Sequence, residues 1–242
     1  MLITSLNNEH IKDIIKLKNK KYRNDRSLFL VETRHLVIEA YKAGLIEELI
    51  LEEDEILPLG VKTTYVSRDV MQKITDMESH SSAIAVVRKK KAEPIGEKVL
   101  VLDDIQDPGN LGTIIRSALA FNIDTIILSH NTVDLYNPKV IRATQGMIFH
   151  INIIVRDIRK TLKELKEKDY KILGTRVTNG IDARVSKTYS HFVLIIGNEG
   201  RGMSQELENY CDEYLYIKMN DNCESLNASV AASILMYELD RH

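Results

Sequence analysis

Three polar segments of this 242-residue chain each follow a short apolar run, and their residue types could support chemistry. In the first segment, Asn110 comes just after a Pro-Gly turn and is suited to cap a helix. Arg116 would then lie on the second turn of that helix, from where its side chain could reach back toward the loop. Burying this charge among apolar neighbours without a partner would be costly. Taken alone, an ordinary helix cap and a surface arginine explain both residues.

The second segment is a glycine-rich loop directly after the apolar run 192–196. Gly197, Gly200 and Gly202 allow the backbone to approach a ligand closely and to wrap it with amides. Their spacing is neither that of a dinucleotide-binding fingerprint nor that of a phosphate-binding loop. A tight turn and a binding loop explain it equally well, but Glu199 in its middle makes binding the more specific interpretation.

The third segment combines a polar loop with a helix expected from about residue 226. Ser225 and Asn227 are each typical helix caps, yet a cap needs only one such residue. The spacing predicts that Leu226, Val230, Ile234 and Tyr237 share one apolar face of the helix. Small residues between them favour close packing.

The elements that position these segments alternate in a regular way. Nearly continuous apolar runs separated by helical segments are typical of parallel strands buried on both faces. Six such runs occur in the second part of the chain, at 99–102, 125–128, 151–155, 170–173, 192–196 and 214–217. The sequence therefore predicts an open parallel α/β sheet, and sheets of this kind bind ligands at the carboxyl ends of their strands.

The charged Pro- and Gly-containing stretch 88–97 is the best candidate for a linker. It predicts an N-terminal domain over 1–92, with a mixed α/β sandwich, and a second domain over 97–242. In the first domain, residues 10–26 contain seven basic and two acidic side chains. Such a patch could attract phosphate, although a solvated helix face is the alternative.

Composition excludes several classes of protein. The formal net charge is −2 and hydrophobic residues make up 44%, so the chain can bury a real core. No stretch approaches the roughly 20 apolar residues of a membrane span, and no signal layout is visible, which predicts a cytoplasmic protein. Cys211 and Cys223 are too few for a disulfide framework and lack metal-type spacing, so no metal is expected.

Together the three segments resemble the SpoU/TrmH branch of the SPOUT methyltransferases. The sequences DPGNLGTIIRSA, IIGNEGRGMS and ESLNASVAASILMYE match the family's three motifs in order, and the resemblance covers residues 99–239. Residues 5–40 are similar to the N-terminal RNA-binding domain of the family's rRNA enzymes. Three departures stand out: Lys218 and Asp221 replace a Pro and a Gly before the third motif, and Thr33 replaces a frequent Gly.

The resemblance implies an enzyme that transfers a methyl group from S-adenosylmethionine to a ribose 2′-oxygen in RNA. It further implies a trefoil-knotted SPOUT domain and a homodimer with the active site completed across the interface. Arg116 would be the central catalytic residue, clamping a phosphate or accepting a proton, and its orienting partners would be Asn110, Glu199, Ser225 and Asn227. The cofactor would be held by Gly197, Ile217, Leu226, Gly200, Met219 and Thr175.

Because an RNA-modifying domain is expected to follow it in the chain, the basic run 10–26 is interpreted as a phosphate-binding surface. The expected contacts are Lys12, Lys16, Lys20, Lys21 and Arg23. The extended N-terminal domain favours large-subunit rRNA as the substrate. Three alternatives remain: a tRNA 2′-O-methyltransferase, a non-catalytic RNA-binding or ribosome-assembly protein, and a nucleotide-cofactor oxidoreductase. The five polar motif residues argue against the second, and the absence of a first-strand fingerprint argues against the third.

Overall fold

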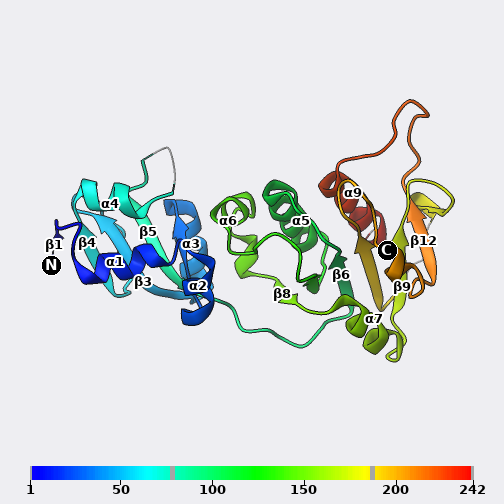
Figure 1. Ribbon diagram of the computed structural model, residues 1–242, viewed down its shortest axis with the longest axis horizontal. Coiled ribbons are helices and arrows are strands. Elements are labelled where there is room, and N and C mark those ends of the chain that lie inside the picture. Colours follow the sequence, from blue (N-terminus) through cyan, green and yellow to red (C-terminus); the bar gives the residue numbers. More distant parts are fainter. Residues whose placement is uncertain (1, 77–79, 186–188, 241–242) are drawn as a thin grey trace. The chain divides into compact units, whose positions relative to one another are not determined.

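The computed structural model describes residues 2–76, 80–185 and 189–240, which form two compact units (Figure 1). The first unit comprises Met1–Lys91 together with Tyr136–Phe149. The second comprises Ala92–Leu135 and His150–His242. Each unit has its own sheet, so each is described separately.

The first unit contains a five-stranded sheet with the order β1-β4-β3-β5-β2. β1, β4 and β3 are parallel, and β5 runs antiparallel to both β3 and β2. The strands are β1 (Leu2–Ile3), β2 (Leu28–Glu32), β3 (Ile46–Glu52), β4 (Thr63–Val66) and β5 (Ala83–Arg88). The helices before and between them are α1 (Glu9–Lys16), α2 (Lys20–Arg26), α3 (Arg34–Lys42) and α4 (Arg68–Ile74). This confirms the smaller α/β domain that the sequence predicts.

The core of the first unit forms where the apolar face of α1 meets α4 and the sheet. Ile11 and Ile14 from α1 pack in one buried cluster with Ile50 and Ile84 from the strands. Asn8 caps α1 by accepting hydrogen bonds from the backbone N–H groups of residues 10 and 11. Apolar spacing and a polar residue at the start therefore suffice to define this helix.

A segment distant in sequence completes the first unit. Tyr136–Phe149 contains α6 (Pro138–Ala143) and a short 3₁₀ helix (Met147–Phe149). The ring of Phe29 lies 4.6 Å from that of Tyr136 and 6.3 Å from that of Phe149, measured between centroids. The predicted second domain, 97–242, includes this segment, because local sequence carries no sign of such long-range aromatic packing.

The second unit is built on a seven-stranded sheet, order β10-β12-β9-β11-β6-β7-β8, in which every pairing is parallel. Its strands are β6 (Lys98–Leu102), β7 (Thr125–Leu128), β8 (Asn152–Val155), β9 (Lys171–Thr175), β10 (Ile181–Asp182), β11 (Phe192–Ile196) and β12 (Glu213–Tyr216). The six predicted strands and the parallel sheet are confirmed. Sequence inspection missed β10, which has only two residues and no apolar run.

Helices cover both faces of this sheet. α7 (Ile158–Lys166) and α8 (Gln205–Glu208) pack on the face that carries Val99, Val101 and Val193. α5 (Pro108–Ala120) packs against α9 (Ala228–Asp240), where the hydroxyls of Ser117 and Ser233 are 2.7 Å apart. Within the described residues, no helix is long and apolar enough to cross a membrane. The knot implied by the resemblance stays a prediction.

The predicted apolar face of α9 is not the face that this helix buries. The buried side chains of α9 are Ser229, Ala232, Leu235, Met236 and Leu239. Val230 and Tyr237, which were expected on the apolar face, are 46% and 53% exposed. The predicted close packing is confirmed, because the small residues Ser229 and Ala232 lie on the buried face where α9 packs against α5.

Candidate functional site

The three motif segments converge at one edge of the second unit's sheet. They follow β6, β11 and β12, and the carboxyl ends of parallel strands lie at the same edge. β6 and β11 are direct neighbours, which brings the loop before α5 against the glycine-rich loop. The sequence prediction that these segments share a site therefore has a simple topological basis.

Glu199 lies at the centre of a hydrogen-bonded network. Its carboxylate accepts hydrogen bonds from the backbone N–H of Asp107 at 3.1 Å and of Gln106 at 3.2 Å, and from the side-chain amide of Asn110 at 3.1 Å. Asn227 donates in turn to the Asn110 side-chain oxygen at 2.9 Å. Residues from all three motifs are thus connected through side chains.

This network determines the charge of Glu199. Partial burial raises the pKa of the Glu199 carboxyl, but the hydrogen bonds from Asn110 and from backbone amides together lower this pKa by more than burial raises it. The net pKa lies below that of an ordinary glutamate, because the donors favour the ionised form. Glu199 is therefore a weak proton acceptor and a strong anchor for the surrounding N–H groups.

The predicted role of Asn110 as the helix cap is wrong. α5 begins at Pro108, and Asp107 is the cap: its side chain accepts from the backbone N–H of Asn110 at 2.7 Å. Asn110 is the third residue of the helix and is buried. The signal was present in the sequence, since an Asp followed by Pro is typical of a cap and a first helical position. The change frees the Asn110 side chain for the network.

Arg116 consequently lies on the third turn of α5, not on the second. Its side chain is exposed and makes no hydrogen bond or ion pair with any residue that the structure describes. It is also absent from the walls of the neighbouring cavity. The structure thus leaves its guanidinium available to a group from outside the chain.

Asn227 and Ser225 occupy different positions within the third motif. Asn227 caps α9, because its side-chain oxygen accepts from the backbone N–H groups of Ser229 at 2.9 Å and Val230 at 3.4 Å. Its amide remains free to reach Asn110. Ser225 instead lines the cavity, and its backbone oxygen accepts from the thiol of Cys223. The predicted crowding of caps thus resolves into one cap and one wall residue.

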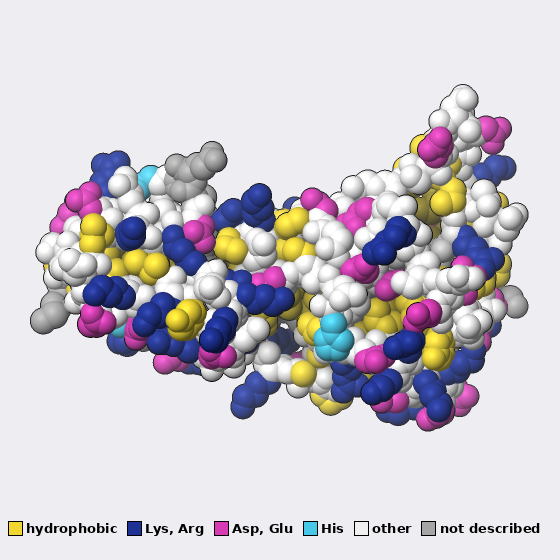
Figure 2. Space-filling view, viewed as in Figure 1, with side chains coloured by type: hydrophobic (Ala, Val, Ile, Leu, Met, Phe, Trp, Pro, Cys, Tyr) yellow, Lys and Arg dark blue, Asp and Glu magenta, His cyan; other side chains and the backbone are white. Residues whose placement is uncertain are grey.

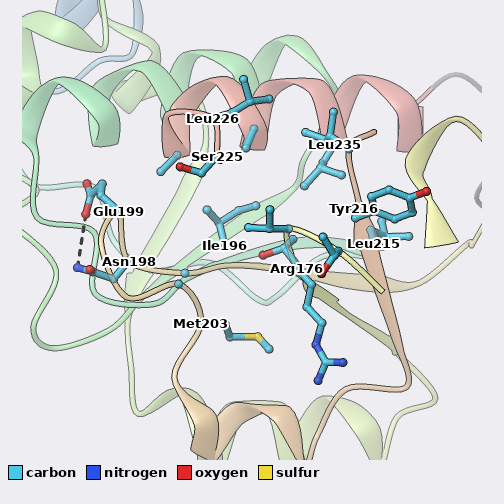
Figure 3. A pocket seen from close by; sticks show the side chains of 18 of the residues that line it. Arg176, Ile196, Asn198, Glu199, Met203, Leu215, Tyr216, Ser225, Leu226 and Leu235 are labelled. Atoms are coloured by element: carbon cyan, nitrogen blue, oxygen red, sulfur yellow. Dashed lines mark hydrogen bonds between the residues drawn. The ribbon is translucent and has the colours of Figure 1, made fainter. Parts of the chain in front are cut away.

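A cavity of about 570 Å³ opens beside this network (Figure 3). Glu199 lies toward one end of it and Tyr216 toward the other. All six residues assigned to the cofactor on the basis of the resemblance line it: Gly197, Ile217, Leu226, Gly200, Met219 and Thr175. Three further lining residues, which lie outside the three motifs, were not predicted from the sequence: Arg176, Glu208 and Tyr216.

Gly197 is required by a close approach of backbone. A Cβ atom at this position would lie 2.1 Å from the backbone nitrogen of Met203 and 2.2 Å from the carbonyl carbon of Gly202. The loop between them is closed by two reciprocal backbone hydrogen bonds of 2.9 Å between Asn198 and Gly202. The Asn198 side chain then donates to the backbone oxygen of Asp104 at 2.8 Å, which fastens the glycine-rich loop to the first motif.

The predicted RNA contacts of the first unit fall into three groups. Lys12 and Lys16 are exposed but engaged in ion pairs with Glu9 and Asp13, at 2.9 and 2.8 Å. Lys20 and Lys21 are exposed at the start of α2. The third group is Arg23 alone, and the predicted phosphate contact by this residue is wrong.

Arg23 is only 5% exposed. Its guanidinium donates to the backbone oxygens of Leu17 at 3.0 Å and Lys18 at 2.6 Å. It therefore satisfies carbonyl groups at the end of α1 and ties the two helices together. A charge-based interpretation of sequence cannot distinguish such a buried arginine from an exposed one.

The fold and the site define an α/β protein with a ligand cavity and a polar network at the carboxyl edge of a parallel sheet. Residues 97–237 match the model of the SpoU rRNA Methylase family, and residues 8–85 match that of an MRM3-like substrate binding domain. The chain belongs to the SpoU rRNA methylase family. The part of the chain that carries the three motifs and the part that carries the basic run thus each match a known type of domain.

Relatives of known name and structure agree with this membership. The chain is 37% identical over 98% of both sequences to a Bacillus subtilis protein named 23S rRNA (guanosine(2553)-2′-O)-methyltransferase RlmP. An S-adenosylmethionine-bound rRNA methyltransferase from Sinorhizobium meliloti matches it with a TM-score of 0.90 at 29% identity, covering 100% of this chain and 98% of the other. The SpoU methyltransferase AviRb from Streptomyces viridochromogenes, 24% identical over 97% of both chains, shares the fold with a TM-score of 0.84.

Proposed function

We propose that this protein transfers a methyl group from S-adenosylmethionine to a ribose 2′-hydroxyl of rRNA. The observation that carries the proposal is the union of three motifs of this family at one sheet edge. There they form a hydrogen-bonded network beside a cavity of cofactor size. A relative of nearly equal length and 37% identity bears the corresponding name.

The cavity fits the cofactor in size and in chemistry. Its volume is within the range of small-molecule sites, and the missing side chain of Gly197 leaves room for backbone to surround a ligand. Gly197, Ile217 and Leu226 would hold the adenine part, and Gly200, Met219 and Thr175 would complete the site. When bound, S-adenosylmethionine supplies the electrophilic methyl group.

The chain's own residues must orient a ribose oxygen and assist the loss of its proton. Arginine stays protonated in proteins, so Arg116 serves as a clamp for the phosphate beside the target ribose. Its exposure and its lack of a partner among the residues that the structure describes support this role. Asn110, Glu199 and Asn227 hold the loops in place, and Ser225, which lines the cavity, would help to orient the ribose.

Large-subunit rRNA is favoured over tRNA by the extent of the similarity. Solved structures of rRNA methyltransferases cover the whole chain, first unit included. Two structures described as tRNA enzymes cover only 60% of it. The first unit, which matches a substrate-binding domain model, is therefore the part that adapts the enzyme to rRNA. A cytoplasmic location belongs to the same proposal.

A homodimer belongs to the same proposal. The outer face of α9 exposes Val230 and Tyr237, and the Tyr237 ring packs edge-on against Phe121 beyond the end of α5, with centroids 5.6 Å apart. This apolar strip begins at Val230, whose backbone N–H donates to Asn227 of the network, and it suits a second copy of the chain that completes the site.

The test is methyl transfer from radiolabelled S-adenosylmethionine to unmodified total RNA, followed by separation of rRNA from tRNA. We expect label in one large rRNA. Label in tRNA alone would support the alternative tRNA enzyme. Absence of both label and cofactor binding would support the non-catalytic alternative.

A further inference from the structure

α2 presents an exposed aromatic ring within a basic surface. Tyr22 is 37% exposed and follows directly after Lys20 and Lys21. Figure 2 shows Lys and Arg side chains, with hydrophobic ones and some Asp and Glu side chains between them, on the face of the first unit along which α1 and α2 run in Figure 1. An exposed ring surrounded by cations is a composition that binds unpaired nucleotides.

The neighbouring side chains make this surface positive. Lys16, on the neighbouring helix α1, and Arg26, on α2, add two more exposed cations to this part of the first unit. Asp13 neutralises part of that charge, since its carboxylate lies 2.8 Å from Lys16 and 3.3 Å from Arg26. Lys20 and Lys21, by contrast, make no ion pair with any described residue. Two cations without an ion-pair partner among the described residues thus lie within two positions of Tyr22 at the start of α2.

α2 is also anchored at both ends and to α1, so the backbone that carries Tyr22 is held in place. Asn19 caps the start of the helix by accepting from the backbone N–H of Lys21 at 2.9 Å. Ser27 ends it in the left-handed conformation, with a φ of +53°. Buried Arg23, next to Tyr22, fastens the helix to the end of α1. A backbone that is held in place before binding loses little entropy when a base stacks on the ring it carries.

We propose that Tyr22 is a stacking surface for an unpaired base of the RNA substrate, with Lys20 and Lys21 binding the adjoining phosphates. The inference rests on the proposed function and adds the chemistry by which the first unit selects its substrate. Phosphate contacts alone distinguish sequences and shapes poorly, whereas stacking requires a base that is not paired. The first unit therefore selects a single-stranded or looped element of the rRNA.

Another exposed tyrosine of the same unit provides a matched control. Tyr41 on α3 is 41% exposed, but Val37 and Ile38 precede it by one helical turn, and the adjacent Lys42 is paired with Glu39. It has similar exposure without the cationic surroundings. Replacement of Tyr41 should therefore leave RNA binding unchanged.

The experiment compares binding of an unpaired RNA oligonucleotide of about 12 residues with binding of its duplex, using the full-length protein. Tyr22→Ala should weaken single-strand binding at least about fivefold, as expected for loss of one stacked base. Tyr22→Phe and Tyr41→Ala should bind as the parent protein does. Equal losses for Tyr22→Ala and Tyr41→Ala, or equal losses on single strand and duplex, would overturn the proposal.

Salt dependence separates the ring from the charges. The double variant Lys20→Ala/Lys21→Ala should reduce the slope of log affinity against log salt by about 1.4. Tyr22→Ala should leave that slope unchanged, and a reduced slope would show that its effect is electrostatic. Because the chain contains no tryptophan, a Tyr22→Trp variant carries a single reporter, whose fluorescence should be quenched by single-stranded RNA. Absence of quenching despite binding would contradict stacking.

A final measurement keeps this inference distinct from the proposed function. Tyr22→Ala should raise the KM for rRNA in the methyl-transfer assay while kcat stays unchanged, because the ring lies outside the cofactor cavity. Unchanged KM would reject the stacking role and leave the enzyme activity standing. Absence of transfer by the parent protein would reject the proposed function itself.

Discussion

At the residue scale, Glu199 and Arg116 have opposite environments. The Glu199 carboxylate is surrounded by N–H donors from the other motifs, whereas Arg116 contacts none of the described polar groups. The first residue therefore organises the site from within, and the second is available to the substrate. This difference predicts different effects of substitution.

Glu199→Gln should lower kcat roughly 10- to 100-fold, because a carboxamide places N–H groups against N–H donors and leaves about 1–3 kcal/mol of hydrogen bonding unmet. The pKa of Glu199 is lower in the folded protein than that of an ordinary glutamate. The Glu199 carboxylate therefore stabilises the loops fully at pH values above the ordinary glutamate pKa, and this stabilisation is lost as the pH falls through the lowered pKa. Activity should thus persist into mildly acidic solution. Glu206→Gln, an exposed carboxylate on α8, is the control and should leave kcat unchanged.

Arg116→Ala should abolish methyl transfer and leave cofactor affinity within a few-fold, because Arg116 does not line the cavity. Calorimetry of S-adenosylmethionine binding measures the second quantity. Arg116→Lys keeps the charge but loses the bidentate fork, so partial activity is expected. Parallel loss of cofactor binding and activity would show that the residue is structural instead.

At the element scale, sequence was informative wherever local pattern determines structure. The six apolar runs became parallel strands, and the three motifs met at their carboxyl ends. The errors have a common cause, since they concern choices made by tertiary packing. α9 turns Val230 and Tyr237 outward and buries Leu235 and Met236 instead, and Arg23 is buried because α1 ends beside it. Neither arrangement can be inferred from spacing along one helix.

Thr33 shows how a departure from the family pattern changes an element. It begins α3 with a φ of +81° and a ψ of 140°, a conformation that favours glycine and strains a β-branched residue. Its hydroxyl gives only a long contact of 3.4 Å to the backbone N–H of Leu36. Thr33→Gly should therefore increase the free energy of unfolding by about 1 kcal/mol.

Denaturant unfolding of the full chain checks this prediction, with Thr33→Ala as the matched variant. Alanine also removes the hydroxyl contact but keeps a Cβ atom. The free energy of unfolding of Thr33→Ala should therefore be lower than that of Thr33→Gly. A glycine variant less stable than the parent protein would show that the cap outweighs the strain at this position.

At the scale of the whole molecule, the exposed strip on α9 predicts self-association. Light scattering should give twice the mass of one chain. Val230→Asp should shift the mass toward that of one chain and reduce methyl transfer, because a charge is costly to bury in an apolar interface. Ile56→Asp, at an exposed apolar residue of the first unit, should change neither quantity. A monomeric parent protein with full activity would contradict the dimer.

The division into units also affects how the molecule should be dissected. Residues 136–149 lie within the predicted second domain, yet Tyr136 and Phe149 pack on Phe29. Removal of residues 1–92 would expose these rings, so loss of RNA binding in such a fragment would have two explanations. Point variants in the full chain, such as those at Tyr22 and Lys20, avoid this ambiguity.

The central claim is that the methyl group is placed on a ribose oxygen of large-subunit rRNA. It is tested most directly by incubating unmodified large rRNA with the protein and labelled S-adenosylmethionine, and then digesting the RNA to nucleosides for mass spectrometry. We expect one nucleoside with the methyl on its ribose, present with the parent protein and absent with Arg116→Ala. A methyl group on a base, or ribose methylation that persists without Arg116, would contradict it.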